Sequence, residues 1–219
     1  ESMPMLAYIL KVISPLEVAP RLLECVDCGD RYAIVMDLCT GGDLSERLKR
    51  ARVLDDDKAR NITFQVATAL AACHKRSVWH QDLTTDHVMF LCPEGFGASP
   101  EKAWRVCLVG FTNCAKAGGM PSPSPQGPGS KQWQTDEEHA PMCGGGLKLH
   151  SHFGGRVTDA SPEQLVGRVE RPEAVDVWAL GVMLYLMVCG RQPFNNAIEV
   201  MQGQLVLPAY LSESLSCLL

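Results

Sequence analysis

The segment from His80 to His87, with the sequence HQDLTTDH, is the most informative stretch of this 219-residue chain. It places two carboxylates, Asp82 and Asp86, among hydroxyl and imidazole side chains. A carboxylate can accept a proton from a hydroxyl group, and its oxygens are hard ligands that Mg²⁺ prefers to imidazole. A histidine in a loop beside a strand, as His87 is here, is more often packed and hydrogen-bonded than bound to a metal. The segment could therefore move a proton, or help to recruit a metal ion.

Helices and strands must position this loop, and the apolar pattern predicts several of them. Between Asp57 and Lys75 the apolar residues recur at the spacing of one helix face, which predicts a helix with one buried side. Short apolar runs at 88–91 and 106–109 indicate two strands. From Val177 through Val188 nearly every position is apolar, which predicts a helix surrounded by protein, with Asp176 as its N-cap.

The order of these segments resembles the order found in protein kinases, over nearly the whole chain. Residues 80–87 resemble the catalytic loop H-R-D-L-x-x-x-N. Residues 32–44 resemble the last small-lobe strand, the hinge and the start of the first large-lobe helix. The sequence SPE at 161–163 resembles the Ala-Pro-Glu that closes an activation segment, and residues 176–181 resemble the start of the central helix. The chain is thus similar to protein kinases, and to those of the serine/threonine type.

This resemblance implies an α+β, protein-kinase-like bilobal fold, mostly the helical large lobe with a truncated small lobe. Residues 1–39 would form a partial small lobe and hinge, without the N-terminal strands. Residues 40–219 would form the large lobe, ending before its last helix. An activation-segment insertion at about 115–150 is expected to be disordered, because its Pro-, Ser- and Gly-rich sequence buries little apolar surface. Ser122 and Ser124 in it precede prolines, so a proline-directed kinase could modify them.

The resemblance also assigns roles to side chains that the chain keeps. Asp82 would be the base that accepts the proton of a substrate hydroxyl. The hinge backbone could receive the adenine of ATP through main-chain groups of Met36, Asp37, Leu38 and Cys39, with Met36 as the gatekeeper. Structural roles, in anchoring the catalytic loop and in assembling the large lobe, fall to His80, Glu163, Asp176 and Trp178.

Four side chains that phosphoryl transfer needs are missing. Kinases hold Mg²⁺ with the Asp of Asp-Phe-Gly and the Asn of the catalytic loop, and this chain has Gly110 and His87 there. Thr84 replaces the Lys that steadies the transferred phosphate, and Gln81 replaces the Arg that pairs with a phosphorylated loop. No acidic residue lies near Leu6, where a helix should present a Glu to the ATP-binding Lys. The resemblance therefore implies no Mg²⁺ site and leaves ATP as the one cofactor to consider.

Composition limits the partners. A net charge of −5 and a pI near 5.7 argue against nucleic acid or an anionic membrane as the partner, because both need a concentrated basic face. The uncharged stretch 177–190 is too short to span a bilayer, and no signal peptide is expected. Cys25 and Cys28 have the spacing of half a zinc site, but no second pair follows. Free cysteines in apolar positions suit the cytoplasm.

Three hypotheses remain open. The first is a pseudokinase that docks protein partners, such as an active kinase, as a scaffold or allosteric regulator in signalling. The alternative is a weakly active or unconventional serine/threonine kinase, in which Asp82 positions a hydroxyl while Asp86 or His87 helps to recruit metal. The third is a decayed paralogue without a folded product, which the apolar pattern of the central helix disfavours because drift would have introduced polar residues.

Overall fold

The computed structural model describes residues 4–29, 31–93, 103–116, 142–143, 147–148 and 156–219. The fold is mixed α+β and mostly helical, with small two-stranded antiparallel sheets, as expected for the fold class. Most of the predicted insertion, including Ser122 and Ser124, lies outside the described residues. The parts of it that are described are the short strands β6 (Ala115–Lys116), β7 (Met142–Cys143) and β8 (Leu147–Lys148).

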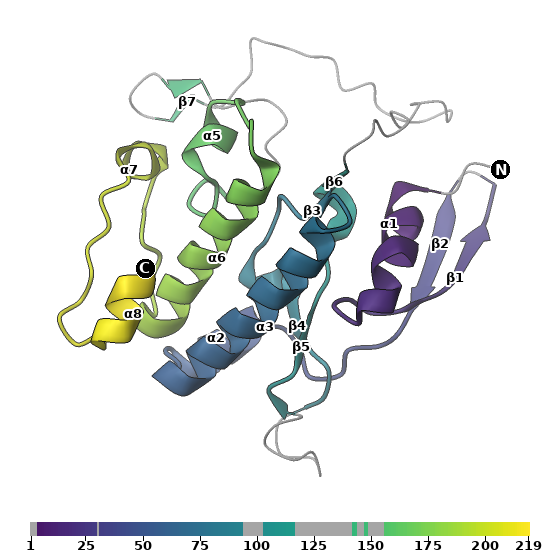
Figure 1. Ribbon diagram of the computed structural model, residues 1–219, viewed down its shortest axis with the longest axis horizontal. Coiled ribbons are helices and arrows are strands. Elements are labelled where there is room, and N and C mark those ends of the chain that lie inside the picture. Colours follow the sequence, from purple (N-terminus) through teal and green to yellow (C-terminus); the bar gives the residue numbers. More distant parts are fainter. Residues whose placement is uncertain (1–3, 30, 94–102, 117–141, 144–146, 149–155) are drawn as a thin grey trace.

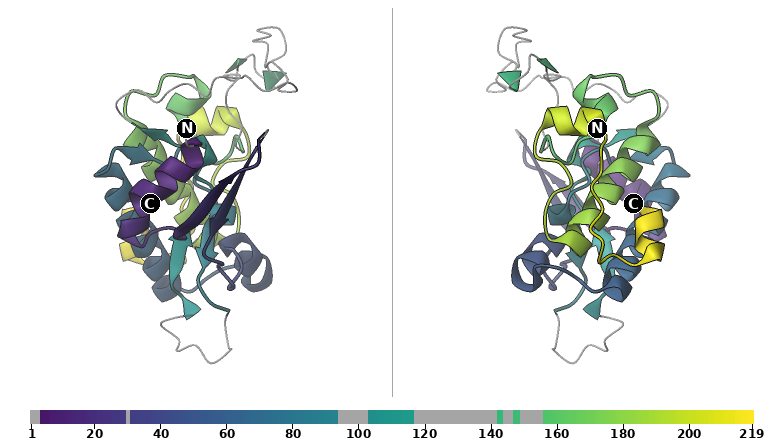
Figure 2. Two further views of the ribbon diagram at one scale, coloured as in Figure 1. Left: turned by 90° about the vertical axis from the view of Figure 1, so that its right-hand side faces the viewer. Right: turned by 90° about the vertical axis from the view of Figure 1, so that its left-hand side faces the viewer.

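The N-terminal part consists of one helix and one hairpin. Helix α1 (Met5–Ile13) is followed by strands β1 (Leu22–Asp27) and β2 (Tyr32–Met36), which pair antiparallel. Figure 2 shows this hairpin beside α1 on one side of the molecule, with α6, α7 and α8 on the opposite side. The sequence of α1, MLAYILKVI, contains no acidic residue, so this helix cannot present a carboxylate to a neighbouring strand.

Several helices contribute to the main core. Helices α2 (Leu44–Ala51) and α3 (Asp56–His74) are capped at their N-termini by Asp43 and Asp55, whose side chains each accept a backbone N–H from the first turn. Helix α3 packs along α6 (Pro172–Cys189), the long helix beside it in Figure 1. The apolar face predicted between 57 and 75 is the buried face of α3, and the residues that the two helices contribute to this core include Ile62, Val66, Leu70, Met183 and Met187.

Short strands frame the loop that holds the candidate residues. Strand β3 (Val78–Trp79) pairs with β6, and β4 (Val88–Phe90) pairs antiparallel with β5 (Val106–Leu108). The 3₁₀ turns η2 (Thr85–His87) and η3 (Phe111–Asn113) lie next to these strands. The C-terminal region adds three short helices, α5 (Pro162–Leu165), α7 (Ala197–Gln202) and α8 (Glu213–Leu218).

The start of α6 differs from the prediction. The helix begins at Pro172 and not at Val177, because a proline at the first helical position has a preset φ and gives up no needed N–H group. Asp176 is therefore not the N-cap, which is Arg171, but lies inside the helix with its side chain buried. The earlier start also makes α6 long and apolar enough to cross a membrane by length and composition alone, although half of it is buried within the protein.

The core between α3 and α6 gives a direct stability test. Ile62→Ala should lower the free energy of unfolding by about 2–5 kcal/mol, because it removes fully buried methyl groups and leaves a cavity. Phe64, two residues on in the same helix, is 71% exposed, and Phe64→Ala should change that free energy by less than about 0.5 kcal/mol. Urea unfolding monitored by circular dichroism measures both. Equal effects of the two substitutions would contradict the assigned buried face.

Candidate functional site

A buried carboxylate fixes the start of the loop between β3 and β4. Asp176 on α6 accepts the backbone N–H of Gln81 through Oδ1 at 2.7 Å and that of His80 through Oδ2 at 2.9 Å. Its Oδ2 also lies 2.7 Å from Nε2 of His74 at the end of α3. Gln81 has a φ of 60°, in the left-handed region. One side chain thus ties α3, α6 and a strained loop backbone together.

His80 is part of the protein interior. Its Nε2 donates to the carbonyl of Val109 at 2.8 Å, its Nδ1 lies 3.4 Å from the backbone N of Asp82, and its ring packs on Phe111 with centroids 4.7 Å apart. The ring is 1% exposed, and this burial lowers the pKa of His80. The side chain is therefore neutral at pH 7 and joins the loop to the end of β5.

The lowered pKa of His80 predicts a loss of stability in acid. Below pH about 6.5 the unfolded chain protonates this residue while the folded chain does not, so unfolding takes up a proton. Stability should fall as the pH drops from 6.5 through the folded pKa, by up to about 1.4 kcal/mol per pH unit. Urea midpoints for wild type and His80→Phe between pH 7.5 and 5 measure this. The variant should show the flatter profile, and parallel profiles would contradict the assignment.

His87 and Gly110, the two positions where metal ligands are missing, lie against each other. Gly110 has a φ of 81°, and a Cβ atom built on it would lie 2.6 Å from Cγ and Nε2 of the His87 ring, with Cδ2 closer still. Nδ1 of His87 lies 2.6 Å from the carbonyl oxygen of Asp82, to which it donates, and 3.3 Å from Oγ1 of Thr84. The imidazole therefore fills the space in which any side chain at position 110 would begin.

The two carboxylates of the loop have partners that the sequence did not indicate. Asp82 Oδ2 accepts a hydrogen bond from Nδ2 of Asn113 at 2.9 Å. Asp86 Oδ2 lies 3.2 Å from the guanidinium of Arg156, which also pairs with Asp159 at 2.9 Å. Within the described residues no group of three His, Cys, Asp or Glu side chains converges as a metal site would require. Asp82 and Asp86 point to different partners and do not share a site.

The segment that resembles the end of an activation segment contacts the same loop. Ser161 caps α5 in a capping box with Gln164, and Nε2 of Gln164 donates to the carbonyl of Gln81 at 2.9 Å. Glu163 lies in the first turn of α5 and is half-buried. Trp178 stacks on Phe194 with ring centroids 5.6 Å apart, in a second apolar cluster. Gln164 was not predicted, since its link to the loop spans 83 residues.

The hinge candidates are the last residue of β2, Met36, and the three residues that follow it. Met36 is half-buried against the core, while the side chain of Leu38 is 83% exposed. The backbone N–H of Asp37 donates to the carbonyl of Arg21 at 3.1 Å, and their side chains form an exposed ion pair at 3.5 Å. Cys39 contacts Cys107 on β5. These four residues are not brought together with Asp82 by any direct bond among the described residues.

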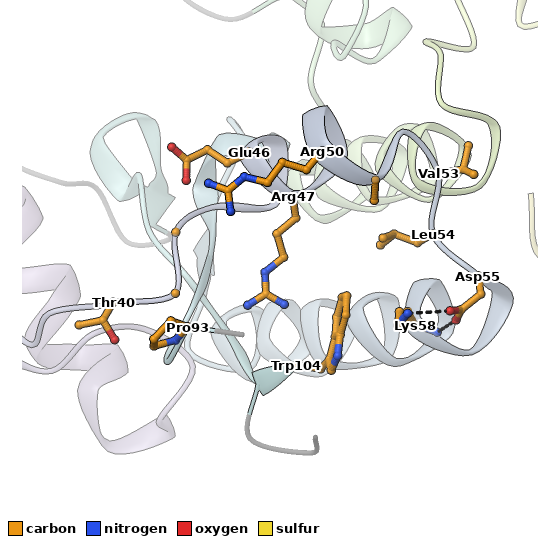
Figure 3. A pocket seen from close by; sticks show the side chains of 13 residues that line it. Thr40, Glu46, Arg47, Arg50, Val53, Leu54, Asp55, Lys58, Pro93 and Trp104 are labelled. Carbon is orange, nitrogen blue, oxygen red and sulfur yellow. Dashed lines mark hydrogen bonds and ion pairs between the residues drawn. The ribbon is translucent and has the colours of Figure 1, made fainter. Parts of the chain in front are cut away.

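A cavity of about 660 Å³ lies elsewhere, between α2, the start of α3 and Trp104. Figure 3 shows Arg47 of α2 projecting into it toward Trp104, with Lys58 paired to Asp55 on one side. The Arg47 guanidinium packs 3.3 Å above the Phe90 ring centroid, so it is part of the core of this region. The lining does not include Asp82, His87 or Gly110, so this cavity is separate from the catalytic-loop candidates.

Comparison with known proteins identifies the class of the domain. Residues 8–97 match the protein kinase domain family. Sperm motility kinase 1 of Mus musculus is 30% identical over 190 residues, which are 86% of this chain and 32% of that protein. Testis-specific serine/threonine-protein kinase 1 of Homo sapiens is 30% identical over 164 residues, 75% of this chain and 36% of that protein. The chain thus carries a protein kinase domain, with distant similarity to serine/threonine kinases.

The human SNF-related serine/threonine-protein kinase is 26% identical over 200 residues, which are 88% of this chain and 21% of that protein. The chain therefore spans about a fifth to just over a third of the length of these three relatives. The similarity to sperm motility kinase 1 covers 190 residues and therefore extends well beyond residues 8–97.

Proposed function

We propose that this protein kinase domain is a pseudokinase, which binds protein partners as a scaffold or allosteric regulator in signalling and does not transfer phosphate efficiently. The observation that carries the proposal is the packing of the His87 ring on Gly110. Kinases use these two positions to hold the Mg²⁺ ions that align and neutralise the phosphates of ATP. Here Gly110 has no side chain, and the imidazole of His87 occupies the space in which a side chain at position 110 would lie.

Other oxygen ligands do not compensate at this place. Asp82 is bonded to Asn113, and Asp86 is turned toward Arg156. Without the metal, phosphoryl transfer loses several kcal/mol of charge stabilisation, and each 1.36 kcal/mol corresponds to about a tenfold loss of rate. The residues present therefore do not fit a Mg²⁺ ion held in the way that kinases hold it, and no step through such an ion is proposed.

The anchoring of the loop still supports a role for this region in binding. Asp176, His80 and Gln164 hold the backbone around Asp82, and this scaffold does not depend on metal. The hinge main chain after Met36 would receive adenine, since such bonds use no lost side chain. We propose ATP binding without catalysis there, in a cytoplasmic protein whose partners are proteins, including an active kinase, and not nucleic acid or membrane.

The alternative is a weakly active or unconventional serine/threonine kinase. It is favoured by the retained Asp82, whose carboxylate is positioned by Asn113 at the surface of the loop. In this case Asp82 would accept the proton of a substrate hydroxyl while the γ-phosphate of ATP is transferred to it.

A transfer assay separates the two functions. The full-length protein and its Asp82→Asn variant are incubated with radiolabelled ATP, Mg²⁺ or Mn²⁺, and protein substrates rich in serine and threonine. If the domain is a pseudokinase, the wild-type protein should incorporate no more label than the Asp82→Asn variant, because the chemical step lacks its metal. Incorporation at least tenfold above the Asp82→Asn variant would overturn the proposal and establish the weakly active kinase.

A further inference from the structure

Two cysteines from distant parts of the chain meet beside the hinge. Sγ of Cys39, three residues after β2, lies 3.3 Å from Sγ of Cys107 in the middle of β5. The two residues are 68 positions apart in the sequence, and neither spacing nor motif predicts their contact. At this distance the sulfur atoms are in direct contact, and closing to a bond of about 2.05 Å requires a movement of only about 1.3 Å.

The two thiols differ in how they meet solvent. Cys39 is half-buried on the hinge, so a small oxidant can reach it, whereas Cys107 is 3% exposed. Burial and the contact with Cys39 raise the pKa of Cys107, which keeps it protonated until its partner reacts. When an accessible thiol contacts a buried one, an oxidant can convert the accessible cysteine to a sulfenic acid. The buried neighbour can then react with that sulfenic acid to form a disulfide.

Three other described cysteines have different surroundings. Cys28 Sγ contacts the carbonyl of Val26, and Cys114 Sγ donates to the carbonyl of Phe111 at 2.7 Å. Cys73 is buried in the α3 core, and burial raises its pKa to about 12. The contact between Cys39 and Cys107 thus joins two sulfur atoms, whereas Cys28 and Cys114 contact carbonyl oxygens.

We propose that Cys39 and Cys107 form a redox-active dithiol, which a hydroperoxide oxidises to an intramolecular disulfide between the hinge and β5. The Cys39 thiolate attacks one peroxide oxygen, which gives a sulfenic acid and, with hydrogen peroxide, releases one water after protonation. The Cys107 sulfur then attacks Sγ of Cys39, loses its proton, and displaces hydroxide, which leaves as a second water. The peroxide takes up two electrons and the two thiol protons end in water.

The link would restrain the place where the two parts of the domain join. The chain just after the hinge already bonds to β4, since the backbone N–H of Gly41 donates to the carbonyl of Phe90 at 3.0 Å. Strand β4 pairs with β5 through Met89 and Cys107. A disulfide adds a covalent bond to this hydrogen-bonded corner and closes a long loop of chain, which removes conformational freedom from the unfolded state. This inference is independent of the proposed function, because it needs neither nucleotide nor metal.

To test the inference, the reduced full-length protein is treated with hydrogen peroxide, and its disulfides are mapped by mass spectrometry of non-reduced peptides. The expected product joins the peptides of Cys39 and Cys107, and the melting temperature rises on the order of 5 °C and returns on reduction. Cys39→Ser should abolish both effects, and it keeps a small polar side chain at a half-buried site, so folding is preserved. Cys28→Ser, which removes an exposed cysteine of the hairpin, is the matched control and should retain both.

Two results would overturn the inference. One is oxidation of Cys39 to sulfenic or sulfinic acid while Cys107 stays a free thiol, which would show that the pair does not resolve. The other is a cross-link whose formation leaves the melting temperature unchanged, which would show that it does not restrain the hinge. Neither result bears on the transfer assay, so failure of this inference and failure of the proposed function are distinguishable.

Discussion

Asp176→Ala is expected to lower the free energy of unfolding by about 3–5 kcal/mol. The side chain is fully buried and accepts the backbone N–H groups of the buried His80 and the half-buried Gln81. Alanine leaves these donors, and His74, without an acceptor, and buried unsatisfied groups carry their full desolvation cost. Urea unfolding monitored by circular dichroism gives the value.

Two further variants make the result specific to the carboxylate. Asp176→Asn keeps one acceptor oxygen and nearly the same volume, so it should cost less than alanine and more than zero. Val177, the next residue of α6, is 61% exposed, and Val177→Ala should change the free energy of unfolding by less than about 0.5 kcal/mol. If Asp176→Ala cost no more than Val177→Ala, the carboxylate would not be holding the loop.

Gly110→Ala is expected to destabilise the protein by about 2–5 kcal/mol. One part of the cost is the left-handed backbone at φ 81°, about 1–2 kcal/mol for a residue with a Cβ atom. The other part is the collision of that Cβ with the His87 ring, typical of overpacking at about 1–3 kcal/mol. In a His87→Ala background the second part should disappear. The same urea measurements on the four proteins form a double-mutant cycle with a coupling energy of about 1–3 kcal/mol.

Gly203 supplies the control for the backbone. It ends α7 with a φ of 62°, and a Cβ atom there would meet no atom within 4 Å. Gly203→Ala should therefore show the backbone cost alone, with or without His87. A Gly110→Ala cost that matched Gly203→Ala, or that survived unchanged in the His87→Ala background, would mean that the ring does not fill the space at position 110.

The helices and strands that are determined by the local apolar pattern of the sequence were predictable. The helix expected between 57 and 75 is α3, from Asp56 to His74, because its apolar spacing and its Asp55 cap lie within one segment. The strands at 88–91 and 106–109 are β4 and β5. The start of α6 was wrong, since the prediction followed the apolar run and gave no weight to the proline five residues earlier.

The bonds that make the site were less predictable, because they join residues far apart. Arg156 meets Asp86 across 70 positions and Gln164 meets Gln81 across 83, and no spacing rule connects such pairs. Asn113 lies only three residues after Gly110, yet nothing in its neighbourhood marked it as the partner of Asp82. The sequence alone showed that positions 87 and 110 lack the usual metal ligands. The packing of the His87 ring on Gly110 could be seen only in the folded structure.

The most direct test of the central claim, that positions 87 and 110 offer no oxygen ligand for a divalent ion, is the affinity of the full-length protein for ATP with and without Mg²⁺. Isothermal titration in excess EDTA and in excess Mg²⁺ gives the two dissociation constants. The packing of His87 on Gly110 predicts that they agree within about threefold, because no side chain bridges metal and protein; in energy this is less than about 0.7 kcal/mol. A gain of tenfold or more with Mg²⁺ that is lost in Asp82→Asn or Asp86→Asn would contradict it.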